Sequence, residues 1–106
     1  MPYSRFPTEK QVRKGMGLPA NAKFLGWADH LPESGEFLAA QGGSPDAMLS
    51  VFAQGPSGAK RFVSAAAAGA IVTRQTRAAV VVAIFDRGED YAVIDVAGNQ
   101  HSRFAD

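Results

Sequence analysis

The stretch AAVVVAIF, residues Ala78–Phe85, decides the fold of this chain. All eight residues are apolar, and an acidic residue, Asp86, follows them directly. A short apolar run rich in valine and isoleucine is typical of a strand that is covered on both faces of its sheet. We therefore predict a central strand here, against which the other elements pack.

A hairpin is predicted downstream of this strand. DRGED, residues 86–90, has turn composition centred on Gly88, and Tyr91–Ala97 reads as the returning strand. GNQ, residues 98–100, allows another turn into HSRF, residues 101–104, which would be a short edge strand.

Upstream of the central strand, the pattern predicts one long helix from Pro56 or Ser57 to about Gln75. One stripe of it, within Ser64–Ala70, consists of small residues that favour close packing on the domain's own sheet. The alternative is a symmetric helix–helix dimer. Gly69 lies inside the pattern and costs roughly 1 kcal/mol relative to alanine.

Two further strands are predicted at Lys23–Leu31 and Ala47–Gln54, and Phe37–Gln41 reads as a short strand or a helical turn. Strict alternation assigns the residues of the first strand to two faces. One face holds Phe24, Gly26, Ala28 and His30, and the other holds Leu25, Trp27, Asp29 and Leu31.

A short helix is predicted near the N-terminus. Thr8 and Gln11 have the spacing of a capping box, and the helix from about Glu9 to Met16 should end before Pro19. Residues 1–7 are expected to form a loose arm.

These elements predict a single α+β domain over residues 1–106. It has a mainly antiparallel sheet of four to five strands, with one long helix packed on it and a short N-terminal helix. Short connections between Ala47 and Phe85 also permit a right-handed parallel crossover, which stays an alternative.

Composition narrows the functional classes. The chain has 106 residues, a formal net charge of +1 and no cysteine. Disulfides, thiolate zinc sites and thiol catalysis are therefore excluded. No signal peptide is evident, and each apolar stretch is far shorter than the roughly 20 residues of a membrane helix. We expect a cytoplasmic protein without membrane contact, and the abundance of alanine, glycine and arginine suggests a bacterial one.

The loop QGPSGAKRF, residues 54–62, resembles an anion-binding loop. It lacks the glycine before the lysine and the hydroxyl after it that a nucleotide-hydrolase phosphate loop needs. An anion site at the start of the long helix remains a hypothesis, built from Ser57, Gly58, Lys60 and Arg61. The simpler interpretation, which we favour, is a capped helix start with solvated bases.

Charged residues occur in blocks of one sign, so a neutral chain could still present a basic face to nucleic acid. The candidate residues upstream of the loop are Arg5, Lys10, Arg13 and Lys14. No nucleic-acid-binding motif supports such a face, and we expect these blocks to be solvated or to cancel.

Catalytic residues are sparse. Asp29 and His30 should point to opposite faces of a strand, and His30 and His101 have no metal-ligand spacing. Glu33 and Glu36 read as solvated turn residues. We predict no catalytic residue, no cofactor and no metal.

Aromatic residues near the N-terminus are candidates for partner contact, because aromatic and arginine side chains dominate binding hot spots. They are Tyr3, Phe6 and Trp27. The simpler interpretation, which we favour because Gly26 and Ala28 flank the tryptophan, is that Phe6 fixes the first helix and Trp27 belongs to the core.

The leading hypothesis is a non-catalytic interaction module that binds another protein, or itself as a homodimer. A nucleic-acid-binding regulator is the first alternative. A binder of small anionic ligands at the start of the long helix is the second.

Overall fold

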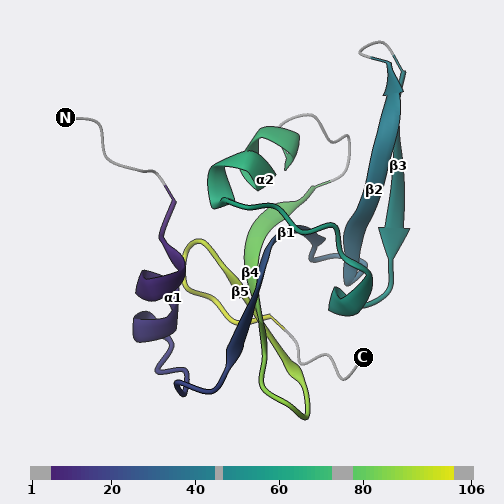
Figure 1. Ribbon diagram of the computed structural model, residues 1–106. Helices are drawn as coiled ribbons and strands as arrows, with labels where there is room; N and C mark the ends of the chain where they lie inside the picture. The colour runs from purple at the N-terminus through teal and green to yellow at the C-terminus, as the bar shows by residue number, and fades with distance from the viewer. Residues whose placement is uncertain (1–5, 45–46, 73–77, 102–106) are drawn as a thin grey trace, which may run out of the picture.

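The fold is α+β, as a computed structural model of the chain shows over residues 6–44, 47–72 and 78–101 (Figure 1). The predicted order of helices and strands is confirmed. The elements are α1 (Glu9–Gly15), β1 (Lys23–Leu31), β2 (Glu36–Ser44), β3 (Ala47–Ala53), the 3-10 turn η1 (Pro56–Gly58), α2 (Ala65–Val72), β4 (Val80–Asp86) and β5 (Tyr91–Asp95).

The five strands form one sheet in the order β3-β2-β1-β4-β5, and every neighbouring pair is antiparallel. β4 lies between β1 and β5, and its residues 81–85 are buried. The expectation of a covered inner strand is therefore confirmed. The parallel crossover is wrong, because three successive antiparallel pairs lead from β3 to β4 and these two strands therefore run in opposite directions.

The core is split by the sheet into two clusters. One cluster joins Val12 of α1 and Ala68 of α2 to Trp27, Val81 and neighbouring residues; we call this side the helix face. The second cluster lies on the opposite face of the sheet and contains Ala28, Phe37, Ala59, Val82, Ile84 and Val93.

The alternation predicted for β1 is wrong at its first residues. The register against β4 shifts between Phe24 and Gly26, and Gly26 has a φ of 143° that suits this bulge. As a result Phe24 packs with the Trp27 cluster and Leu25 packs with the opposite cluster.

The single long helix is also wrong. Of the described residues from Pro56 onward in this predicted helix, only Ala65–Val72 is α-helical, and residues 73–77, which include the predicted helix end, lie outside the described ranges. The reason is that the chain after η1 is extended and bonds to β2 and β1. The Lys60 amide donates to Leu38 O at 2.7 Å, and Phe62 exchanges two backbone hydrogen bonds with Trp27.

Two local predictions are confirmed, the capping box of α1 and the hairpin turn at Gly88, while residues 1–5 of the predicted loose arm lie outside the described residues. Thr8 and Gln11 form the predicted capping box of α1, with both reciprocal bonds present. Gly88 sits in the β4–β5 hairpin at a φ of 96°. Gln100 bridges Ile94, while most of the predicted last strand, residues 102–104, lies outside the described residues. No helix in the described ranges has the length and apolar character needed to cross a membrane.

Candidate functional site

A pocket of about 350 Å³ opens on the helix face between α1, α2 and the start of β1. We call it the aromatic pocket, because three of its lining residues are Phe6, Phe24 and Trp27. The remaining lining residues are Pro7, Thr8, Glu9, Val63, Ser64, Ala65 and Ala66.

Each ring reaches the pocket for a local reason. The bulge in β1 brings Phe24 to the same face as Trp27, and the two rings meet edge-on with centroids 5.8 Å apart. Phe6 lies against α2 at Gly69, where an added Cβ would come within 2.7 Å of Phe6 Cζ. The glycine that weakens the helical pattern therefore makes room for this ring.

Two consecutive residues of the lining, Val63 and Ser64, differ in polarity. The Ser64 hydroxyl accepts a hydrogen bond from the Ala67 amide at 3.1 Å, so it is used in capping α2. Val63 is 97% exposed, which is unusual for a valine that borders a pocket. A partner that covered this rim would remove Val63 from water.

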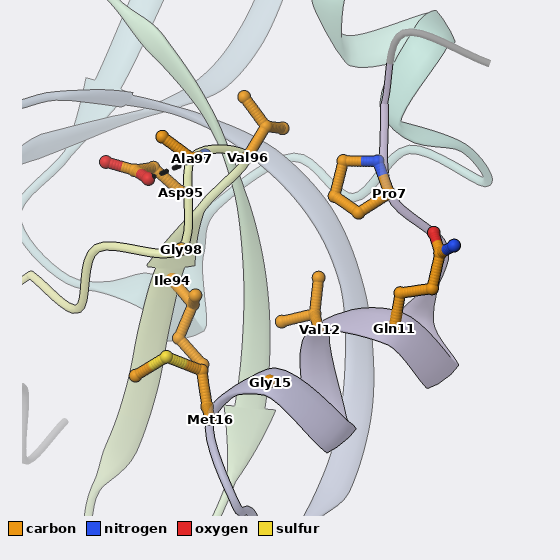
Figure 2. Close-up of a pocket in the computed structure, with 10 residues that line it drawn as sticks. All are labelled: Pro7, Gln11, Val12, Gly15, Met16, Ile94, Asp95, Val96, Ala97 and Gly98. Carbon is orange, nitrogen blue, oxygen red and sulfur yellow. Dashed lines mark hydrogen bonds between the residues drawn. The ribbon is translucent and has the colours of Figure 1, made fainter.

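A second pocket, of about 200 Å³, lies between α1 and the turn after β5; we call it the α1 pocket. Figure 2 shows α1, which carries Val12, on one side of this pocket and the chain from Ile94 to Gly98 on the other, with Pro7 at its edge. Its lining residues are Pro7, Gln11, Val12, Gly15, Met16, Ile94, Asp95, Val96, Ala97 and Gly98. Pro7 lines both pockets, so the two hollows adjoin at this residue.

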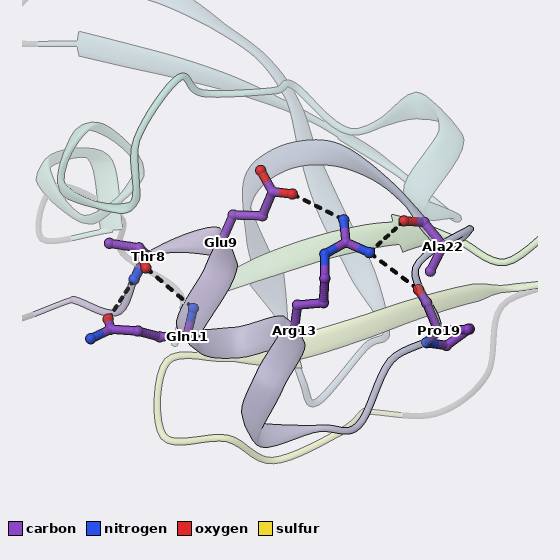
Figure 3. A network of polar contacts seen from close by, with 6 residues as sticks. All are labelled: Thr8, Glu9, Gln11, Arg13, Pro19 and Ala22. Carbon is purple, nitrogen blue, oxygen red and sulfur yellow. Dashed lines mark hydrogen bonds and ion pairs between the residues drawn. The ribbon is translucent and has the colours of Figure 1, made fainter.

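The predicted basic residues of α1 do not act alike. Arg13 is half-buried and well bonded: its guanidinium donates to Glu9 Oε2 at 2.9 Å and to the carbonyls of Pro19 and Ala22 at 3.3 and 2.7 Å (Figure 3). It also lies 5.0 Å from the centre of the Phe85 ring. Lys10 and Lys14 are exposed.

The predicted loop residues lie elsewhere. Ser57 and Gly58 belong to η1, and Lys60 and Arg61 belong to the extended segment that follows it. The premise of an anion site at a long helix start is therefore wrong, since α2 begins only at Ala65. Figure 1 shows η1, the short turn of helix after β3, on a different side of the molecule from α1.

Of the predicted aromatic contacts, Phe6 and Trp27 meet at one pocket, and Tyr3 lies outside the described residues, as does Arg5. Trp27 is also a core residue, only 4% exposed. Sequence reasoning missed Phe24 and Val63. The glycine at position 26 was the available signal for a bulge that turns Phe24 toward Trp27.

The two histidines meet on the face opposite the helices. The His30 and His101 rings are 4.9 Å apart, and His101 Nε2 lies 3.0 Å from Asp95 Oδ2. Burial and the neighbouring His101 lower the pKa of His30 to about 4. Burial favours a higher pKa for Asp95, but hydrogen bonds from Asn99, His101 and Ala97 outweigh it and lower the pKa. This network ties the segment after β5 to the sheet.

Asp29 is the other unusual ionisable group. It is fully buried on the helix face, opposite Val81 in the register, and neither carboxylate oxygen has a hydrogen-bond partner within the described part of the chain. Burial raises its pKa to about 7, against the attraction of Lys60. Asp29 lines neither of the two pockets.

No group of three or more potential metal ligands occurs among the residues described by the structure. No protein-family model, curated protein or solved structure matches this chain. The aromatic pocket, with the adjoining α1 pocket, is therefore the site on which we base a function.

Proposed function

We propose that this chain is a non-catalytic interaction module that binds another protein through the aromatic pocket and the α1 pocket. The observation that carries this proposal is the aromatic pocket, where three rings surround a hollow next to the exposed Val63. Aromatic-lined hollows accept the large apolar anchor side chains that dominate protein interfaces. Because the two pockets adjoin at Pro7, one partner segment with two apolar anchors would fill both.

The charge of the lining residues favours a protein over a nucleic acid. Among the described residues, neither pocket is lined by lysine or arginine, and the charged residues of their linings are the acids Glu9 and Asp95. Phosphate backbones are bound by bases, so these pockets would repel them. The alternative function is nucleic-acid binding through the exposed Lys10 and Lys14. The binding test must therefore distinguish a protein partner from a nucleic acid.

The test uses Trp27, the single tryptophan, as a reporter inside the pocket. Peptides selected from a random display library on the immobilised protein should change Trp27 fluorescence on titration. Val63→Lys should lower the affinity of these peptides roughly five- to tenfold, because the complex then no longer buries an apolar side chain at this position.

Val51→Lys is the matched control, since Val51 is also exposed but lies on β3, away from both pockets. It should leave affinity unchanged. Equal binding by the Val63 variant and wild type would contradict the proposed site. Retention on DNA or RNA that falls steeply with salt would favour the nucleic-acid alternative instead.

A further inference from the structure

The aromatic pocket has walls that suit a cation. Its described lining includes three aromatic residues, Phe6, Phe24 and Trp27. The planes of the Phe24 and Trp27 rings are 71° apart, so the hollow has aromatic walls in two directions. Its volume of about 350 Å³ lies within the range of small-ligand sites. Because the faces of aromatic rings carry partial negative charge, several rings around one hollow attract a cationic group.

The charge of the lining also favours a cation. Among the described residues, Glu9 is the one charged residue that lines this pocket. Arg13 donates to Glu9 Oε2 at 2.9 Å, but it does not line the pocket. Its other terminal nitrogen is held by the carbonyls of Pro19 and Ala22. Since this pairing offsets part of the Glu9 charge, the rings must supply most of the attraction.

The polar atoms of the lining distinguish between kinds of cation. Thr8 Oγ1 and Ser64 Oγ each accept the hydrogen bond that caps a helix, at 3.2 and 3.1 Å, and Glu9 Oε2 is used by Arg13. A lysine ammonium brings three N–H donors, which need acceptors when they leave water. A trimethylated ammonium keeps the charge and has no N–H donor, so its methyl groups can pack against rings without that cost.

We infer that the aromatic pocket binds a trimethylated lysine side chain of the protein partner. The inference rests on the proposed function, because the adjoining α1 pocket would take a neighbouring apolar side chain of the same segment. A choline headgroup of a lipid carries the same ammonium together with a phosphate. Glu9 would repel that phosphate, and no lysine or arginine of the described lining would bind it.

The test compares small probes that differ at the end of one side chain. They are the N-acetyl amides of trimethyllysine, of lysine, and of a neutral analogue with a tert-butyl group in place of the trimethylammonium. Each is titrated against the fluorescence of Trp27. Trimethyllysine should bind roughly tenfold tighter than either of the others, because only it combines charge with a surface of methyl groups. Phosphocholine should bind no tighter than the neutral analogue.

Two variants remove the features that select the cation. Phe24→Leu keeps an apolar residue but removes a ring, and Glu9→Gln removes the charge. Each should reduce the tenfold preference to roughly threefold and leave the affinity for the neutral analogue nearly unchanged. The matched control is Glu89→Gln, an exposed carboxylate between β4 and β5 that lines neither pocket. It should keep the full preference.

Several results would overturn the inference. They are no binding of trimethyllysine, equal binding of the neutral analogue, tighter binding of phosphocholine, or a preference that survives in both pocket variants. The proposed function has its own readout in the display-selected peptides. If these peptides still bind wild type and lose affinity in Val63→Lys, the pocket binds a protein partner through a different anchor. The two failures are therefore distinguishable.

Discussion

At the scale of single residues, position in the fold decides what a charged side chain does. Lys10, Arg13 and Lys14 look equivalent in the sequence, yet only Arg13 is enclosed by its partners. It joins α1 to the turn before β1 through Pro19 and Ala22, as Figure 3 shows. Arg13 therefore stabilises the wall of the α1 pocket and is not available to an anion.

Arg13→Lys tests this role. A lysine keeps the charge but cannot reach Glu9 and two carbonyls at once, because it lacks the planar fork of the guanidinium. We expect a loss of about 1–2 kcal/mol in the free energy of unfolding, measured with urea. Lys14→Gln, an exposed change on the same helix, should stay within about 0.5 kcal/mol of wild type. An unchanged Arg13→Lys protein would mean that the network contributes nothing.

At the residue scale, the sequence predicts the face of a side chain correctly only where its strand is regular. Aromatic character alone singled out Phe6 and Trp27, and both line the same pocket. Phe24 was assigned to the wrong face, since alternation assumes a regular strand and the bulge at Gly26 is fixed by pairing with β4. β1 and β4 are far apart in the sequence, so a local pattern cannot predict this pairing.

At the scale of elements, strands were predictable and the long helix was not. Strand patterns are local, so the alternating or continuous apolar runs are enough to locate β1, β3, β4 and β5. The conformation of residues 59–62 depends on their hydrogen bonds to β1 and β2, which are paired with each other at only two positions. These contacts are distant in sequence, so no local pattern predicts them. Tertiary hydrogen bonds there override helix propensity.

Substitution of Gly69 tests the contact between α2 and Phe6. Alanine should gain roughly 1 kcal/mol of helix stability, but its methyl would displace Phe6. We expect Gly69→Ala to give little or no gain in wild type and the full gain of about 1 kcal/mol in a Phe6→Ala background. Urea unfolding of the four proteins measures this cycle. Equal effects in both backgrounds would show that Phe6 does not limit position 69.

At the scale of the whole molecule, the sheet has two different faces, one packed against α1 and α2 and the other holding the second core cluster. The described chain extends 43 × 40 × 21 Å, with both helices on one face. Asp29 and His30, neighbours in β1, are buried on opposite sides of this sheet. The pKa values of these two residues shift in opposite directions, and this has a measurable effect on global stability.

The signs follow from proton linkage. Asp29 has a folded pKa of about 7, above its ordinary value of 3.8, so its contribution to stability is present below pH 3.8 and is lost as pH rises through 7. His30 has a folded pKa of about 4, below 6.5, so its contribution is present above pH 6.5 and is lost as pH falls through 4. Between about pH 4 and 6.5, Asp29 makes the free energy of unfolding fall with pH and His30 makes it rise, so the two effects oppose each other.

Replacing either Asp29 or His30 by a neutral residue should therefore change the pH dependence of the free energy of unfolding, in opposite directions for the two variants. Relative to wild type, the free energy of unfolding of Asp29→Asn should rise with pH between 4 and 6.5, by up to about 1.4 kcal/mol per unit, because His30 then titrates without compensation. That of His30→Gln should fall with pH over the same window. Asp95 and the other carboxyls are common to all three proteins and cancel in the difference. Urea titrations at pH 4.5, 5.5 and 6.5 measure the slopes, and parallel curves for the three proteins would contradict the buried, unpaired state of Asp29.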